Sequence, residues 1–237
     1  MGSAMSLIEI LRVLYDKFLK YNPKNPQDKS RDRLILSKGH GCLALYALLA
    51  DKKFFNKKIL KSASKFNSIL GGHPEFGKVP GVEASTGALG HGPAIGVGMA
   101  IGAKLNKLKY KTFAIVGDGE INEGSFWESS MIASKHKLNN FHIIIDYNKI
   151  QSYGKTKEVL DLEPLRKKLE TFGYKVSEVN GHNIKQLTQY FKKIKNNKEK
   201  PTALICHTTK GKGFPFAENN PYWHHKNFFS DKEVEDI

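Results

Sequence analysis

The apolar residues of this chain recur with two spacings, one typical of helices and the other of buried strands. Helical spacing predicts four helices, over 7–20, 41–54, 93–106 and 122–137. In the last of these, Phe126, Ile132 and Ala133 are expected on one side. Short apolar runs predict four strands, over 112–116, 141–146, 174–179 and 202–208. Because strands alternate with helical stretches, we expect an α/β fold with a doubly wound, mostly parallel sheet and helices on both faces.

A glycine-rich stretch between the second and third predicted helices has no regular period. It spans 71–92, which makes it too long and too rich in turn residues to be merely a connector. Loops of this kind are usually functional or disordered. A second irregular segment begins at about Gly213. A chain of 237 residues can bury one sizeable core, so we expect a single domain over 1–237 with this segment as its tail.

The chain is strongly basic, with a formal net charge of +15. Nucleic acid is one partner that such a charge suggests, but the basic residues are dispersed or lie in helix-like stretches such as 191–200, without an RNA-binding aromatic signature. We therefore expect no nucleic-acid partner, whereas a positive field also attracts phosphorylated metabolites. No apolar run approaches the roughly 18 residues of a membrane span, and no signal-peptide pattern is present. Cys42 and Cys206 are predicted to be buried thiols of a cytoplasmic protein with no membrane partner.

Two polar side chains follow neighbouring predicted strands. Asp118 lies between Gly117 and Gly119 directly after the first strand, and Asn148 comes soon after the second. The carboxyl ends of parallel strands meet at one sheet edge, so these side chains can lie together. Carboxylate and amide oxygens suit Mg²⁺ or Ca²⁺, and an incomplete ligand set implies water and phosphate oxygens in the other positions. The pattern therefore predicts a cation that binds a phosphorylated ligand, with the two glycines allowing close backbone approach.

A simpler interpretation of the same turn is local. Asp118 and Asn122 could cap turns, and Glu120, Glu123 and Glu128 could favour the positive end of the following helix. For Glu120 and Glu128 we expect only this role, at the start of the helix and facing solvent.

Several motifs together resemble one enzyme family. The span from Gly117 to Asn148 resembles the diphosphate-binding motif of thiamine-diphosphate enzymes. "DRLILSKGHGCLALYALLA" (32–50), the stretch 71–92 and "HTTKGKG" (207–213) resemble the transketolase family, in the family's order. The resemblance runs to about His224 and covers the diphosphate-binding domain, whereas the pyrimidine-binding domain of full-length transketolases is absent. It implies the thiamine-diphosphate-binding fold and the N-terminal subunit of a split transketolase.

The resemblance also implies roles for individual residues. The metal ligands would be Asp118, Asn148 and the backbone carbonyl of Ile150. The cofactor, thiamine diphosphate with Mg²⁺ or Ca²⁺, would in addition contact Gly87, Leu89, Gly117 and Gly119. The catalytic residues would be His40, His73 and His224 near the reactive centre and Glu123, which relays between the two cofactor sites of a family dimer.

By the same resemblance, the reaction is transfer of a two-carbon ketol unit from a ketose, expected to be phosphorylated, to an aldose. No residue matches the glutamate that the family carries on the pyrimidine-binding domain. We therefore expect activity only with a separate C-terminal subunit that carries this domain, and self-association into a heterotetramer. The alternatives are a subunit of another thiamine-diphosphate enzyme, such as a 2-oxo acid dehydrogenase or a transketolase-like enzyme of sugar biosynthesis, and a non-catalytic cofactor-binding module.

The motifs depart from the family pattern at a few positions. Ala88 and His91 stand where the family more often has Pro and Gln, and His225 stands where Gly is usual. The family's histidine upstream of the segment that matches residues 2–11 has no counterpart here. These departures leave the metal site intact but do not specify the sugar.

Overall fold

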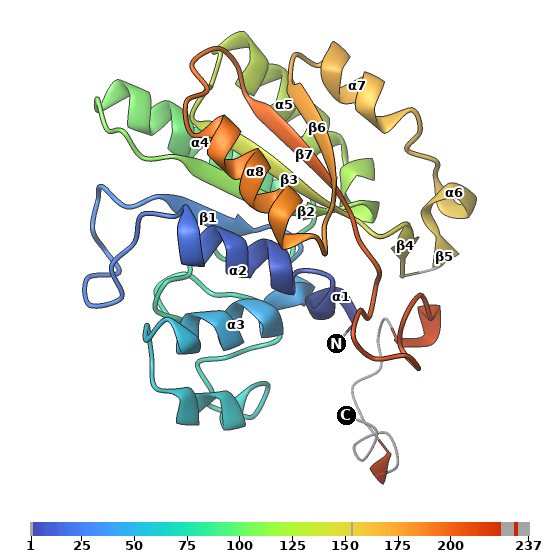
Figure 1. Ribbon diagram of the computed structural model, residues 1–237. Helices are drawn as coiled ribbons and strands as arrows, with labels where there is room; N and C mark the ends of the chain where they lie inside the picture. Colours follow the sequence, from blue (N-terminus) through green and yellow to red (C-terminus); the bar gives the residue numbers. More distant parts are fainter. Residues whose placement is uncertain (1, 153, 224–229, 232–237) are drawn as a thin grey trace.

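A computed structural model gives the structure of the chain and describes residues 2–152, 154–223, 230 and 231 (Figure 1). Its centre is a five-stranded sheet in the order β1-β2-β3-β7-β6, in which every neighbouring pair is parallel. The strands are β1 (Arg33–Leu36), β2 (Thr112–Gly117), β3 (Phe141–Tyr147), β6 (Lys175–Asn180) and β7 (Thr202–His207). A separate antiparallel pair is formed by β4 (Ile150–Gln151) and β5 (Gly154–Lys155).

Helices cover both faces of the sheet, as predicted (Figure 1). They are α1 (Gly2–Met5), α2 (Ile8–Lys17), α3 (Cys42–Asp51), α4 (His91–Leu105), α5 (Gly124–Lys135), α6 (Thr156–Val159), α7 (Leu165–Thr171) and α8 (Ile184–Ile194). Short 3₁₀ helices lie at η1 (Gly39–Gly41), η2 (Lys57–Ser62), η3 (Gly119–Asn122) and η4 (Pro221–Trp223).

The alternation of side chains along β2 explains the two cores. Phe113 and Ile115 join the core that contains residues of α2, α3 and α8. Ala114 and Val116, which point to the opposite face, join the core that contains residues of α4, α5 and α7. Because both faces are covered, β2 and β3 are almost continuously apolar, which is typical of inner strands of a parallel sheet.

All four predicted strands are present, and the four predicted helices correspond to α2, α3, α4 and α5 with shifted ends. The sequence pattern missed β1, a run of only four residues. It also misplaced Ile132, which is 45% exposed, whereas Phe126 and Ala133 are buried as expected. Cys42 and Cys206 are both free and buried, which confirms the predicted burial of the two thiols. No helix in the described part of the chain combines the length and the apolar character of a membrane span.

The register brings four strand ends to one edge of the sheet. Gly117, the last residue of β2, pairs with Asp146 of β3, and Asp146 pairs with Cys206 of β7. β1, on the other side of β2, ends at Leu36, which pairs with Ile115 of β2. The loops that follow these strands therefore begin side by side, and they carry most of the polar residues singled out from the sequence.

Candidate functional site

A cavity of about 390 Å³ opens at this carboxyl edge of the sheet. Its wall contains most of the predicted site residues: His40, Leu89, Gly117, Asp118, Gly119, Glu123, Asn148 and Ile150. The wall also contains residues that the sequence interpretation did not assign, among them Ser3, Lys38, Glu120, Gln151 and Lys210. The structure thus brings together positions that are more than one hundred residues apart in the chain.

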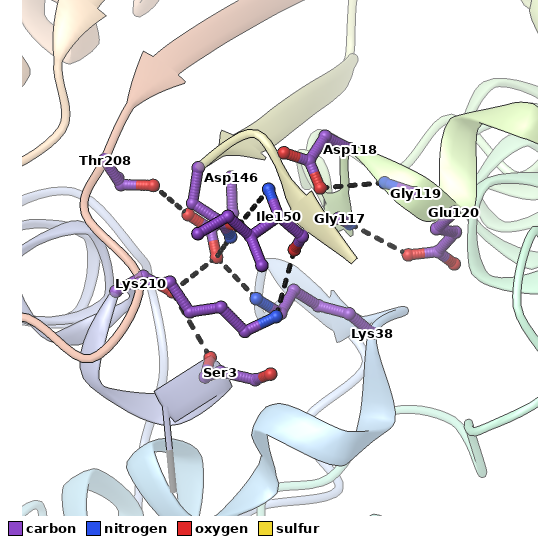
Figure 2. A network of polar contacts seen from close by, with 12 residues as sticks. Ser3, Lys38, Gly117, Asp118, Gly119, Glu120, Asp146, Ile150, Thr208 and Lys210 are labelled. Carbon is purple, nitrogen blue, oxygen red and sulfur yellow. Dashed lines mark hydrogen bonds and ion pairs between the residues drawn. The ribbon is translucent and has the colours of Figure 1, made fainter. Parts of the chain in front are cut away.

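Asp118 is buried at the base of the cavity, only 3% exposed. Its Oδ1 accepts a hydrogen bond from the Gly119 amide at 2.8 Å (Figure 2). Its Oδ2 accepts one from the Lys149 amide. Burial and the nearby Asp146 carboxylate raise the pKa of Asp118 to about 6, against the effect of the two amides. A carboxylate in this position is stabilised by an additional positive charge.

Asn148 and Ile150 lie beside the GDG turn, on either side of Lys149, whose amide donates to Asp118. Asn148 Oδ1 accepts from the Ile150 amide at 3.1 Å, and the Ile150 carbonyl accepts from Lys210 Nζ at 3.0 Å. Each of these oxygens has a second lone pair that could coordinate a cation. Within the described residues, no group of three or more His, Cys, Asp or Glu side chains could hold a metal ion. The donor set here is instead one carboxylate, one amide and one carbonyl oxygen, which suits Mg²⁺ or Ca²⁺.

The glycines of the turn allow close approach. A Cβ atom on Gly119 would lie 2.8 Å from Gln151 Oε1, so this position cannot carry a side chain without displacing Gln151. The Gly119 amide donates a hydrogen bond to the Asp118 carboxylate.

Two buried lysines supply positive charge beside the predicted metal ligands. Lys38, which is 2% exposed, pairs with Asp146, which has no exposed surface. Asp146 also accepts from Ser6 Oγ at 2.6 Å and from Thr208 Oγ1 (Figure 2). Burial would raise the pKa of Asp146, but Lys38 and these hydroxyls outweigh burial and lower it. The buried pair and its hydroxyl donors therefore join β3 to the segments that follow α1, β1 and β7, at the edge where the cavity opens.

Lys210 is the second buried lysine. Burial and the proximity of Lys38 lower the pKa of Lys210 to about 8, and Asp118 and Asp146 partly oppose this shift. Sequence reasoning did not single out Lys38 or Lys210, although both stand inside the quoted motifs "SKGHG" and "HTTKGKG". In a chain with 38 Lys and Arg residues, a lysine carries little signal until the fold shows that it is buried.

The predicted catalytic histidines differ in placement. His40, in η1, lines the cavity. His73 is not in the cavity wall, but its ring lies against Gly39 and Gly87: a Cβ on either glycine would approach His73 Cδ2 to 3.0 and 2.8 Å, respectively. The Tyr46 hydroxyl, on α3, donates to the His73 carbonyl at 2.8 Å. This hydrogen bond holds the loop that contains His73 against α3. His224 lies outside the described residues.

Of the acidic residues after the GDG turn, one prediction was wrong. Glu123 is exposed and lines the cavity, and Glu128 is exposed on α5, as expected. Glu120 was expected to face solvent, but it is 2% exposed. Its carboxylate accepts hydrogen bonds from Ser37 Oγ and from two backbone amides, so long-range donors, rather than the helix start, determine where it lies. Burial raises the pKa of Glu120 against the effect of these donors.

Comparison with known proteins gives a consistent result. Residues 1–237 match the family model described as "Transketolase, thiamine diphosphate binding domain". The chain is 43% identical over 224 residues to a subunit of the apulose-4-phosphate transketolase of Phocaeicola vulgatus, with 94% of this chain and 79% of that protein covered. It is 38% identical over 217 residues to 6-deoxy-6-sulfo-D-fructose transketolase subunit SqwG of Clostridium sp., covering 92% and 79% of the two chains.

Solved structures show the same fold. The crystal structure of transketolase from Campylobacter jejuni superimposes with a TM-score of 0.86 at 32% identity, over 94% of this chain and 38% of that chain. Human transketolase, at 35% identity over 225 residues, is likewise covered to 36% of its length. This chain therefore spans well under half of these longer relatives, but about four-fifths of the proteins named as subunits.

Proposed function

Since the chain belongs to the transketolase family, we propose that it is the N-terminal, thiamine diphosphate-binding subunit of a two-subunit transketolase. The observation that carries the proposal is the meeting of Asp118, Asn148 and the Ile150 carbonyl in one cavity that also contains Lys38 and Lys210. Three hard oxygen donors suit a divalent cation, and two ammonium groups suit a diphosphate. The reaction is transfer of a two-carbon ketol unit from a ketose to an aldose.

The chain's own residues have separate tasks in this proposal. Mg²⁺, or Ca²⁺ in its place, would be held by the three predicted oxygen ligands, and the diphosphate would lie against Gly117 and Gly119, which line the same cavity. Gly87 and Leu89 would contact the cofactor ring. The bound cofactor supplies the carbanion chemistry, and the protein binds and orients it. His40 and His73 hold or move protons at the oxygen atoms of the sugar, for which an imidazole is suited near neutral pH. His224 and Glu123 have the roles that the family resemblance implies.

Two observations support partners for this chain. Relatives of similar length are named as transketolase subunits, which supports a separate protein carrying the pyrimidine-binding domain. Neighbouring helices α4 and α5 leave Leu105, Met131 and Ile132 exposed, and a Cβ on Gly98 or Gly102 would meet open space. Such an apolar face supports self-association, and hence a heterotetramer of two chains of each kind. We propose that this assembly works in the cytoplasm, where buried free thiols stay reduced.

The substrate is proposed to be a ketose that carries an anionic group. The relatives named above are transketolase subunits for apulose-4-phosphate and for 6-deoxy-6-sulfo-D-fructose, and both names contain an anionic group. The net charge of +15 on this chain would favour the approach of such sugars.

Calorimetric titration with thiamine diphosphate and Mg²⁺ tests the proposal, on the chain alone and on the chain co-expressed with the product of the neighbouring gene. We expect binding in at least one form, and Asp118→Asn should reduce it by more than about 100-fold because a charged metal ligand is lost. Glu128→Gln removes an exposed carboxylate ten residues away and should leave the affinity unchanged. No binding in either form, or equal binding by Asp118→Asn, contradicts the proposed function.

A further inference from the structure

Glu120 is a buried carboxylate in the cavity wall that none of the proposed cofactor contacts uses. We infer that Glu120 is a positioning residue: its carboxylate ties together the three loops that present Lys38, Leu89 and Asp118 to the ligand. This inference rests on the proposed function, because it assigns Glu120 to the cofactor site of that function.

The three donors to Glu120 come from three separate segments. Oε1 accepts from Ser37 Oγ, at the end of β1, and from the Gly90 amide at 2.9 Å, immediately before α4. Oε2 accepts from the Gly117 amide at 3.0 Å, at the end of β2 (Figure 2). One side chain therefore joins segments that are up to eighty residues apart in the sequence.

Each donor is the immediate neighbour of a residue that lines the cavity. Ser37 precedes Lys38, Gly90 follows Leu89, and Gly117 precedes Asp118. Because adjacent Cα atoms are held at a fixed separation by the peptide bond, fixing the donor limits how far its neighbour can move. Glu120 thus acts on the ligand indirectly, by holding in place the neighbours of the residues that line the cavity.

The packing around these bonds leaves the loops little freedom. Ser37 Oγ also accepts from the Gly92 amide at 3.1 Å, so the serine hydroxyl proton goes to Glu120. A Cβ on Gly92 would lie 2.3 Å from Ser37 Oγ, and a Cβ on Gly90 would lie 2.4 Å from Ser125 Oγ. The segment that contains Ser37 and the segment that contains Gly90 and Gly92 are therefore in direct contact. A substitution at Glu120 is expected to alter the positions of both segments.

The pattern requires a carboxylate and not an amide. All three groups donate to Glu120, and a carboxylate has only acceptor atoms. In Glu120→Gln, whichever atom carries the amide hydrogens faces at least one backbone N–H, so a buried donor loses its partner. The substitution keeps the shape of the side chain but breaks at least one of the hydrogen bonds that join the three segments.

Glu120→Gln is the direct test, and Glu83→Gln is its matched control. Glu83 is also buried and accepts from Arg31 at 2.9 and 2.7 Å, but it lies outside the cavity wall. Amide hydrogen exchange of the ¹⁵N-labelled full chain reports on the loops. We expect exchange at Gly90 and Gly117 to become at least about tenfold faster in Glu120→Gln and to stay unchanged in Glu83→Gln, because only the first substitution removes a carboxylate that accepts from these two amides.

Binding gives a second readout that a purely structural role would not move. The probes are thiamine diphosphate and inorganic pyrophosphate, each with Mg²⁺, titrated into folded protein by calorimetry. We expect at least about tenfold weaker binding by Glu120→Gln, whereas Glu83→Gln should lower the melting temperature and bind as the unaltered chain does. If Glu120→Gln does not fold, Ser37→Ala, which removes one of the donors, should show a smaller loss of the same kind.

The outcomes separate the two ideas. Unchanged exchange and unchanged affinity in Glu120→Gln overturn the positioning role, and so does an equal loss of affinity in Glu83→Gln, which would indicate general destabilisation. An unaltered chain that binds neither probe, by itself or with its partner, overturns the proposed function instead. In that case, unchanged exchange at Gly90 and Gly117 in Glu120→Gln would also show that Glu120 does not hold these segments together.

Discussion

Replacing Lys38 by methionine should destabilise the fold by about 3–5 kcal/mol, the usual cost of leaving one member of a buried ion pair without its partner. Lys38 is 2% exposed and pairs with Asp146, which has no exposed surface, so solvent does not screen the pair. In the variant, Asp146 keeps the hydroxyls of Ser6 and Thr208 but loses its countercharge. Methionine has a similar length, so the lost charge, rather than a cavity, dominates the effect.

The effect should depend on pH with a definite sign. In the unaltered chain the pKa of Asp146 is lowered, so the pair contributes stability that is lost as pH falls through that lowered value. Without Lys38, burial raises the pKa of Asp146 instead, and protonation then relieves the unpaired charge. The difference in unfolding free energy between the variant and the unaltered chain should therefore narrow as pH falls from 7 toward 5.

Urea unfolding followed by circular dichroism measures this. With a slope of about 2–3 kcal/mol per molar urea, the midpoint should fall by roughly 1–2.5 M at pH 7. The double variant Lys38→Met with Asp146→Asn removes both charges and should recover most of the loss. A loss below about 1 kcal/mol in Lys38→Met, or no recovery in the double variant, would refute the view that an unpaired buried charge causes the effect.

Three further predictions concern single side chains. Gly87→Ala, at a φ of 139°, places a Cβ 2.8 Å from His73 Cδ2 and should lower kcat of the assembled enzyme; an unchanged kcat contradicts the placement of His73. Burial lowers the pKa of His142 to about 3, so the stability that its neutral form provides is present above about pH 6.5 and is lost as pH falls toward 3. His142→Phe should flatten that slope in acid unfolding, and an unchanged slope would assign it to other groups. Lys210→Met should weaken binding of pyrophosphate with Mg²⁺ by about tenfold or more in calorimetry, since a charged donor is removed, and equal affinity would place the diphosphate elsewhere.

The parts of the site that the sequence predicted are those that follow from strand topology. Asp118 and Asn148 come after adjacent parallel strands, and this rule alone places them at one edge. β1 was missed because the three-residue apolar run between Arg33 and Ser37 has too few residues to show a period. Its burial comes from long-range packing, since its neighbour in the sheet, β2, is about eighty residues away.

Glu120 could not be predicted for a different physical reason. Local rules favour an acid at the start of a helix and in solvent, and Glu120 does lie in the first turn of the 3₁₀ helix η3. What buries it is a set of donors from Ser37 and Gly90, and no pattern in the sequence around Glu120 reports on them. The family resemblance supplied the order of the motifs, but only the packing shows that this side chain joins them.

From the buried charges around the cavity we expect the proposed cation and diphosphate to bind together. Among the described residues, the buried charged groups at this edge are three carboxylates and two ammonium groups, a net charge of −1: Asp118, Glu120, Asp146, Lys38 and Lys210. A divalent cation changes the sum to +1, and only then does the site favour an anion. Pyrophosphate should therefore bind far more weakly in EDTA than with Mg²⁺, by at least about 100-fold if one bound ion supplies the missing attraction. Calorimetry in both buffers measures the ratio, and equal affinities would mean that the lysines alone hold the diphosphate.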